Sequence, residues 1–200
     1  MSGVLITCFE PFDRFKANPS MDIAEHLSKE HGGAQVLILP VVYGEAGRRL
    51  IERLEGLRPD LILSFGLNPT IGHINIEELA VNIRASEVPD NKGTVISDQP
   101  VDPQGPLALR TGLPAGSIVE VLRGAGIPAK RSFSAGVYLC NEVYYTALSW
   151  CRKNGGNALF VHVPLATHMV EKAQNDPHMP ISDLKKAAGM VLDASMGHIR

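Results

Sequence analysis

Short apolar runs alternate with amphipathic segments along this chain, and the alternation restricts the folds it can adopt. The apolar runs of the first third are Gly3–Thr7, Ala34–Val42 and Leu61–Phe65. Between them, Ser20 is predicted to cap a helix, and Glu45–Leu57 carries apolar residues at helical spacing. Strands and helices that alternate over short connections favour an α/β fold with a central, mostly parallel twisted sheet and helices on both faces.

The middle of the chain departs from this alternation. Residues 74–83 look extended, and residues 86–114 are rich in proline and glycine. We expect the second segment to be a long functional loop or, in part, a hairpin. Helices are predicted at 117–123 and 181–196, and a strand at 129–133. The sequence contains no internal repeat and no convincing boundary, so a single domain over residues 1–200 is expected.

Composition excludes several classes of protein. The formal net charge is −2 and no block of like charge occurs, which disfavours a role in binding nucleic acid or a membrane surface. No apolar stretch approaches the roughly 20 residues of a membrane span. The first residues do not resemble a secretory signal. The three cysteines form neither a disulfide framework nor a C-x-x-C pair, so a cytoplasmic protein is expected.

Cys140 and His162 are the strongest candidates for chemistry. Cys140 ends the run SAGVYLC and directly precedes a predicted helix, whose N-terminus favours a thiolate. His162 lies in the next apolar run, ALFVHVP, where an imidazole could hold the proton of the thiol. Either residue alone is more often part of a core. Together they predict a cysteine hydrolase, with Cys8 as a secondary candidate and Cys151 as a core residue.

A third group that orients the imidazole would complete a triad. Glu77 and Glu78 are both candidates, the sequence pattern does not choose between them, and both could be solvated. The segment FEPFDRFKANPS places Phe9, Phe12 and Phe15 in a loop, which indicates either an apolar pocket or a small satellite cluster.

No metal or phosphate motif accompanies these residues. His162 and His168 give H-x5-H, without H-E-x-x-H or a cysteine pair. The G-x-G-x-x-G and G-x-x-x-x-G-K-[ST] patterns are absent, and so is the G-x-S-x-G elbow of serine hydrolases. We therefore expect neither a metal nor a cofactor.

Four segments, taken in order, resemble the pyroglutamyl peptidase I family of cysteine peptidases, also called pyrrolidone-carboxylate peptidases. They are TCFEPFDRFKANPS, LPVVYGEA, INIEELAVNIRASEVPDNKG, and GVYLCNEVYY followed by FVHVP. The resemblance implies a single α/β domain, a homotetramer, and removal of N-terminal pyroglutamate (5-oxoproline) from peptides without metal or cofactor.

The resemblance also implies roles for individual residues. It makes Cys140 the nucleophile, His162 its acid–base partner, and Glu77, which opens the E-x-x-A-x-N pattern, the orienting carboxylate. The residues implied to hold the pyroglutamyl ring or to line its pocket are Phe9, Phe12, Asn18, Tyr138 and Leu139. Because pyroglutamate carries no positive charge, a pocket without an acidic anchor is expected.

The sequence departs from the family pattern at Cys8, where glycine is usual, at Leu67, where glutamine is usual, and at Glu87, where arginine is usual. An arginine near a developing oxyanion would stabilise it and a glutamate would oppose it. Arg84 is a candidate replacement. The alternative function is therefore a weakly active or inactive homologue that binds 5-oxoproline-like ligands. Action on a nucleoside or another small amide is a further alternative, and the missing phosphate motif disfavours the nucleoside.

Overall fold

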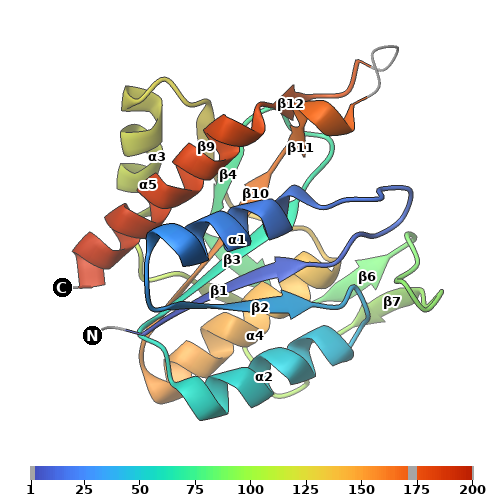
Figure 1. Ribbon diagram of the computed structural model, residues 1–200. Coiled ribbons are helices and arrows are strands. Elements are labelled where there is room, and N and C mark those ends of the chain that lie inside the picture. The colour runs from blue at the N-terminus through green and yellow to red at the C-terminus, as the bar shows by residue number, and fades with distance from the viewer. Residues whose placement is uncertain (1–2, 171–174, 200) are drawn as a thin grey trace.

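The computed structural model describes residues 3–170 and 175–199, which build an α/β fold around one central sheet (Figure 1). The strand order is β2-β1-β3-β10-β4-β9. All neighbouring strands are parallel except β10 and β4, which are antiparallel. The predicted mostly parallel sheet is thus confirmed. Its strands are β1 (Val4–Phe9), β2 (Ala34–Leu39), β3 (Leu61–Leu67), β4 (Ile74–Glu77), β9 (Ala129–Ser132) and β10 (Asn157–Val163).

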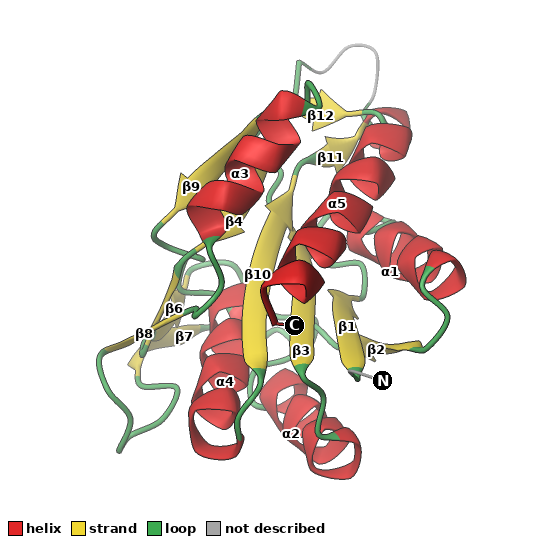
Figure 2. Ribbon diagram, turned by 90° about the vertical axis from the view of Figure 1, so that its left-hand side faces the viewer, coloured by secondary structure: helices red, strands yellow, loops and turns green. Residues whose placement is uncertain are grey.

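Helices cover both faces of the sheet, as predicted (Figure 2). One face carries α1 (Pro19–Glu30), α3 (Ala115–Gly124) and α5 (Ile181–Ile199), with α5 packed against the other two. The opposite face carries α2 (Glu45–Leu57) and α4 (Leu139–Asn154), which pack against each other. Within the described residues, no helix has both the length and the apolar character that crossing a membrane would require.

The alternation of side chains along each strand divides the core into two layers. On β10, Leu159 and Val161 belong to the layer under α1, α3 and α5, whereas Phe160 belongs to the layer under α2 and α4. On β4, Ile76 lies in the first layer. Successive residues of a strand point to opposite faces, so Glu77 and His162 both lie on the face that α4 covers.

The start of α1 and the end of β2 differ from the prediction. Asn18, and not Ser20, caps α1: its side-chain oxygen accepts a hydrogen bond from the Ser20 backbone N–H at 3.2 Å. Pro19 begins the helix, at a position where its missing N–H costs nothing. β2 ends at Leu39 instead of Val42, because Pro40 cannot donate to the strand ladder.

The middle of the chain is more ordered than a long loop. The extended stretch at 74–83 is two strands separated by Glu78. The first belongs to the central sheet, and the proline- and glycine-rich segment supplies the partner of the second and of the short strand that follows it. The pairs β5–β8 and β6–β7 are both antiparallel, which confirms the hairpin alternative. The short elements outside the central sheet are β5 (Leu79–Val81), β6 (Arg84–Ser86), β7 (Ile96–Gln99), β8 (Ala108–Arg110), β11 (Leu165–Ala166), β12 (His178–Met179) and η1 (Thr167–Met169).

Candidate active site

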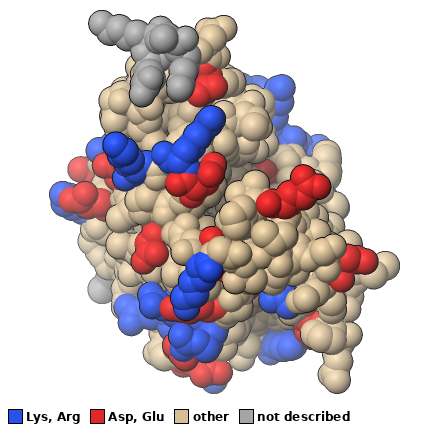
Figure 3. Space-filling model, turned by 90° about the vertical axis from the view of Figure 1, so that its right-hand side faces the viewer, with Lys and Arg blue, Asp and Glu red and all other residues tan. Residues whose placement is uncertain are grey.

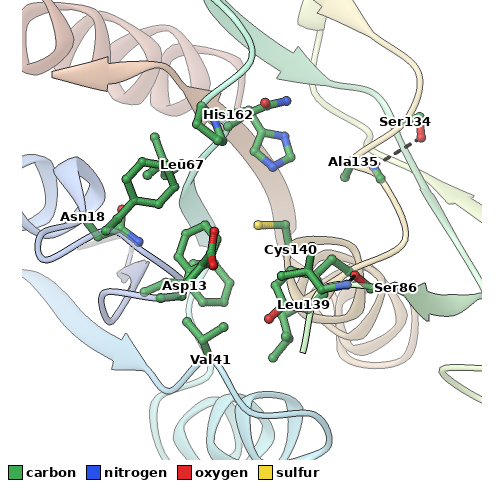
Figure 4. A pocket seen from close by; sticks show the side chains of 18 residues that line it. Asp13, Asn18, Val41, Leu67, Ser86, Ser134, Ala135, Leu139, Cys140 and His162 are labelled. Atoms are coloured by element: carbon green, nitrogen blue, oxygen red, sulfur yellow. Dashed lines mark hydrogen bonds between the residues drawn. The ribbon is translucent and has the colours of Figure 1, made fainter. Parts of the chain in front are cut away.

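A cavity of about 420 Å³ opens where β1, β3 and β10 end and α4 begins. In Figure 4, the side chains of Cys140 and His162 project into this cavity from neighbouring elements. It collects every pocket residue implied by the sequence, because the carboxyl ends of parallel strands meet at one edge of a sheet. The predicted residues that line it are Phe9, Phe12, Asn18, Tyr138, Leu139, Cys140 and His162.

Cys140 lies in the first turn of α4, one residue after its start at Leu139. The first N–H groups of a helix have no partner within it, and they carry its positive dipole end. Both effects favour negative charge that develops next to this position. The Cys140 side chain is half-buried, so the sulfur is sheltered and yet open to the cavity.

His162 and Glu77 form a buried pair behind the sulfur. Nδ1 of His162 and Oε1 of Glu77 are 2.9 Å apart, and the two residues are 6% and 0% exposed. The ring of Phe160 packs against the imidazole, with centroids 4.9 Å apart. Because Nδ1 is engaged by the carboxylate, Nε2 remains for exchange of a proton with a group in the cavity.

Charges on both sides of His162 determine its protonation. Burial alone would lower its pKa, but the Cys140 thiolate and the Glu77 carboxylate together raise the pKa to about 9. The imidazole is therefore protonated at neutral pH when the thiolate is present. The arrangement supports a thiolate–imidazolium pair, which is the reactive form of a cysteine nucleophile.

Glu78 is excluded as the orienting group by its direction. Its carboxylate forms ion pairs with Arg110, at 3.0 Å, and with Arg131. The two glutamates are adjacent in sequence and so point to different sides of the strand. Neither is solvated, since Glu77 is 0% and Glu78 2% exposed. The alternative that both lie in solvent is therefore wrong.

Cys8 does not join the site, although it lies in a central strand, one residue before the end of β1. It is fully buried in the layer under α1, and burial raises the pKa of its thiol to about 12. The secondary candidate is therefore wrong, because the side-chain alternation of β1 turns this thiol away from the cavity. Cys151 packs in the core as expected, with its pKa also raised to about 12 by burial.

The aromatic loop builds one wall of the cavity. Phe9 is buried, and Phe12 packs on Phe15 and Tyr138 with centroid separations of 5.8 and 6.4 Å. The Tyr138 hydroxyl donates to the Pro89 carbonyl at 3.0 Å, which ties this wall to the segment after β6. The three phenylalanine residues thus line an apolar pocket and do not form a separate satellite cluster, which were the two alternatives that the sequence left open.

Asn18 has most of its hydrogen-bonding capacity engaged in the fold. Its Oδ1 caps α1 and accepts from the Ser20 hydroxyl at 2.8 Å, and its Nδ2 donates to the Glu10 carbonyl at 3.2 Å. A side-chain amide carries two donor hydrogens. One N–H of the Asn18 amide therefore remains for a ligand, and the hydrogen bonds of the cap fix the orientation of the side chain.

The positions that depart from the family pattern fall in different places. Leu67 lines the cavity and makes that part of its wall apolar. Glu87 and Arg84 are not among the residues that line it. The Arg84 guanidinium instead donates to the Pro100 carbonyl at 3.0 Å and lies 3.6 Å from the carboxylate of buried Glu142. Arg84 is therefore held away from the cavity. It does not lie where it could replace the arginine that the family usually has at position 87.

Asp13 and Gly66 are site residues that sequence reasoning missed. Asp13 lines the cavity from an exposed position, so it does not test the expectation that no acidic group anchors the terminal ring. The only signal in the sequence was the position of Asp13 inside the aromatic loop motif.

Gly66 pairs with His162 in the register of β3 and β10. Within the described residues, no group of three or more His, Cys, Asp or Glu side chains is arranged to hold a metal ion.

Gly66→Ala is expected to lower kcat/KM by about 10²-fold, because a small displacement of a reacting group has a large effect on rate. A Cβ at this position would lie 2.7 Å from Phe160 Cζ and 2.9 Å from Cys140 Sγ, so the sulfur must move. Gly56→Ala is the control, since its Cβ would meet nothing within 4 Å. Full activity of Gly66→Ala in a steady-state assay would contradict the close contact with the sulfur.

Comparison with known proteins places the chain in a family. The family model for pyroglutamyl peptidase matches residues 2–196. The pyrrolidone-carboxylate peptidase of Thermococcus litoralis is 36% identical, with 100% of this chain and 95% of that protein covered. The Pyrococcus furiosus protein is 43% identical, with 80% of each covered.

Solved structures agree with this comparison. The pyrrolidone carboxyl peptidase structure from Thermococcus litoralis matches with a TM-score of 0.93 at 35% identity, covering 100% of this chain and 95% of that one. The structure of the Pyrococcus furiosus protein matches with the same TM-score at 36% identity, covering 99% and 100%. Sequence and fold thus agree over nearly the whole chain, which belongs to the pyroglutamyl peptidase family.

Proposed function

We propose that this protein removes pyroglutamate from the N-terminus of peptides, with Cys140 as nucleophile, His162 as acid–base partner and Glu77 as the orienting carboxylate. One observation carries the proposal: Glu77 engages Nδ1 of a buried imidazole that faces the same cavity as a cysteine at a helix start. This is the arrangement that nucleophilic acyl transfer requires.

The reaction proceeds in two acyl transfers. The Cys140 thiolate attacks the carbonyl carbon that joins pyroglutamate to the next residue, and N–H groups at the start of α4 stabilise the oxyanion. His162 then protonates the leaving amine as the C–N bond breaks, which leaves a thioester. Water attacks the thioester with His162 as general base, and pyroglutamate and the free thiol are released.

The cavity suits a small uncharged ring. Phe9 and Phe12 provide apolar surface for the two faces of the lactam, and the remaining N–H of Asn18 can donate to its carbonyl. Tyr138 and Leu139 form the adjoining wall, next to the nucleophile. Affinity comes from the apolar contacts and selectivity from the hydrogen bonds to the lactam.

The test is release of a fluorescent amine from pyroglutamyl, prolyl and alanyl amides, with a reducing agent present to keep the thiol free. Turnover of the pyroglutamyl amide alone is expected. Rapid loss of one thiol to iodoacetamide at neutral pH should accompany it, because Cys8 and Cys151 are buried. Binding of pyroglutamate without turnover would instead support the inactive homologue.

The rate is expected to fall as the pH rises through about 9. The folded-state pKa of His162 is raised from 6.5 to about 9, so the proton needed by the leaving amine is present below that value and lost above it. The contribution of this proton to the free energy of unfolding is likewise fully present below about pH 6.5, and it is lost as the pH rises through about 9. A profile of kcat/KM between pH 6 and 10.5 reports this group, and a flat profile to pH 10 would contradict the assignment.

The family resemblance also supports a homotetramer as part of this proposal. Large apolar side chains are exposed at Leu107 (91%), Val95 (56%) and Phe133 (56%), and association of subunits would remove such surfaces from water. Sedimentation velocity at micromolar concentration measures the assembly directly.

A further inference from the structure

Asp13 is an acidic side chain that the proposed mechanism does not use. It follows Phe12 in the aromatic loop and lines the cavity. In Figure 4, its carboxylate points into the cavity, on the side across from Leu139 and Ser86. The ion pairs found among the described residues do not include it. The neighbouring Arg14 guanidinium lies over the Phe15 ring, 5.3 Å from its centroid.

The depth of the cavity indicates which part of a substrate meets Asp13. The floor is closed by buried Phe9, Leu67 and Leu139, which are 3%, 4% and 1% exposed. Asp13 is exposed and lies at the mouth with Val88, which is 44% exposed. The terminal ring occupies the floor, so the residues beyond the scissile bond must leave through the mouth. Exposed Ser134 and Gly136 also line the mouth, so a route past Asp13 is one of the paths open to the residue after pyroglutamate, and it is the path on which that residue meets a charge.

The mouth has a local negative bias. The described residues that line the cavity include no lysine or arginine, and outside the Cys140–His162 pair only Asp13 carries a charge. Outside the lining, exposed Glu87 next to Val88 has the same sign as Asp13, whereas exposed Arg14 and Lys16 on the aromatic loop have the opposite sign, so the negative bias is confined to the lining itself. Elsewhere on this face of the molecule, acidic and basic side chains are interspersed (Figure 3), so no broad basic field opposes this bias.

We infer that Asp13 is a specificity-determining residue, which makes the enzyme prefer pyroglutamyl peptides whose second residue is lysine or arginine. The inference rests on the proposed function. An ion pair at an exposed mouth has a modest effect, about a three- to fivefold preference in kcat/KM over a neutral side chain of similar length. Added salt should reduce the preference, because exposed charges are screened.

The test compares pyroglutamyl-lysine amide with pyroglutamyl-glutamine amide, by chromatographic measurement of released pyroglutamate at low salt. The readout is the ratio of the two kcat/KM values within each variant. Asp13→Asn is suitable because the backbone φ of 52° is left-handed, which asparagine also tolerates. Asp193→Asn on α5 is the matched control, since it removes the same charge from an exposed site outside the cavity.

The expected result is a ratio of about three to five in the wild type and in Asp193→Asn, and a ratio near one in Asp13→Asn. Equal kcat/KM values for the lysine and glutamine amides in the wild type would overturn the inference and leave the proposed function intact. A preference for the lysine amide that survives in Asp13→Asn would do the same. Faster cleavage of a prolyl than a pyroglutamyl amide would also overturn it, by placing the carboxylate beside the ring nitrogen. Absence of turnover on every pyroglutamyl substrate would overturn both.

Discussion

Cys140→Ser is expected to abolish turnover of pyroglutamyl amides while the fold is retained. A serine hydroxyl does not ionise near neutral pH, so the charge that raises the pKa of His162 disappears together with the nucleophile. Loss of a nucleophile that acts as one unit with its base lowers kcat by at least about 10⁴-fold. The side chain is half-buried and the replacement has nearly the same shape, so circular dichroism and thermal unfolding should change little.

Cys151→Ser is the matched control for this experiment. Cys151 lies in the same helix, eleven residues after Cys140, but packs in the core under α2 and α4. The control should lose some stability through the buried hydroxyl and retain activity per folded molecule. Turnover that persists in both Cys140→Ser and Cys140→Ala would contradict the assignment of the nucleophile.

Glu77→Gln is expected to lower kcat by about 10² to 10⁴-fold, because a neutral amide can hold the ring but cannot stabilise the imidazolium. The buried carboxylate is 2.9 Å from Nδ1 of His162 and contributes to its raised pKa. Without that charge, the alkaline limb of the pH profile should move toward lower pH. A role confined to packing would reduce stability without moving this limb.

Glu78→Gln is the control for the change of charge. It neutralises the adjacent carboxylate, which is as buried as Glu77 but bonds to Arg110 and Arg131 instead of to the imidazole. Its alkaline limb should stay in place, even though thermal unfolding shifts. Equal rates and equal pH profiles in the two variants would remove Glu77 from its orienting role.

The fold class was predictable because the information that specifies it is local. Runs such as Leu61–Phe65 are too short and too apolar for a surface helix, and Glu45–Leu57 has the period of an amphipathic helix. The boundaries were less predictable where capping decided them: a helix after N-P-S can begin at either residue, and Asn18 became the cap. The prolines between 86 and 114 concealed the short strands β7 and β8, whose partners β6 and β5 lie at the start of this segment or before it.

The pocket residues depended on the resemblance more than on any pattern. Phe9 lies at the end of β1 and not in the loop predicted for it, Phe12 and Asn18 follow it in that loop, and Tyr138 and Leu139 come from the start of a helix more than a hundred residues later. Asp13 was overlooked because a charged residue in a loop is ordinarily solvated. Gly66 directly follows the apolar run 61–65, and no local pattern indicates that Phe160 and the Cys140 sulfur leave no room for a Cβ there.

By itself, the sequence determined the alternation of strands and helices, and it placed a cysteine at a helix start and a histidine in a strand. Only the tertiary structure decided which glutamate meets that histidine and which thiol meets the cavity. The reason is the period of two in a strand: one residue of difference reverses the face, as between Glu77 and Glu78. Which face is the functional one depends on where α4 packs, and that is a long-range contact that no local pattern records.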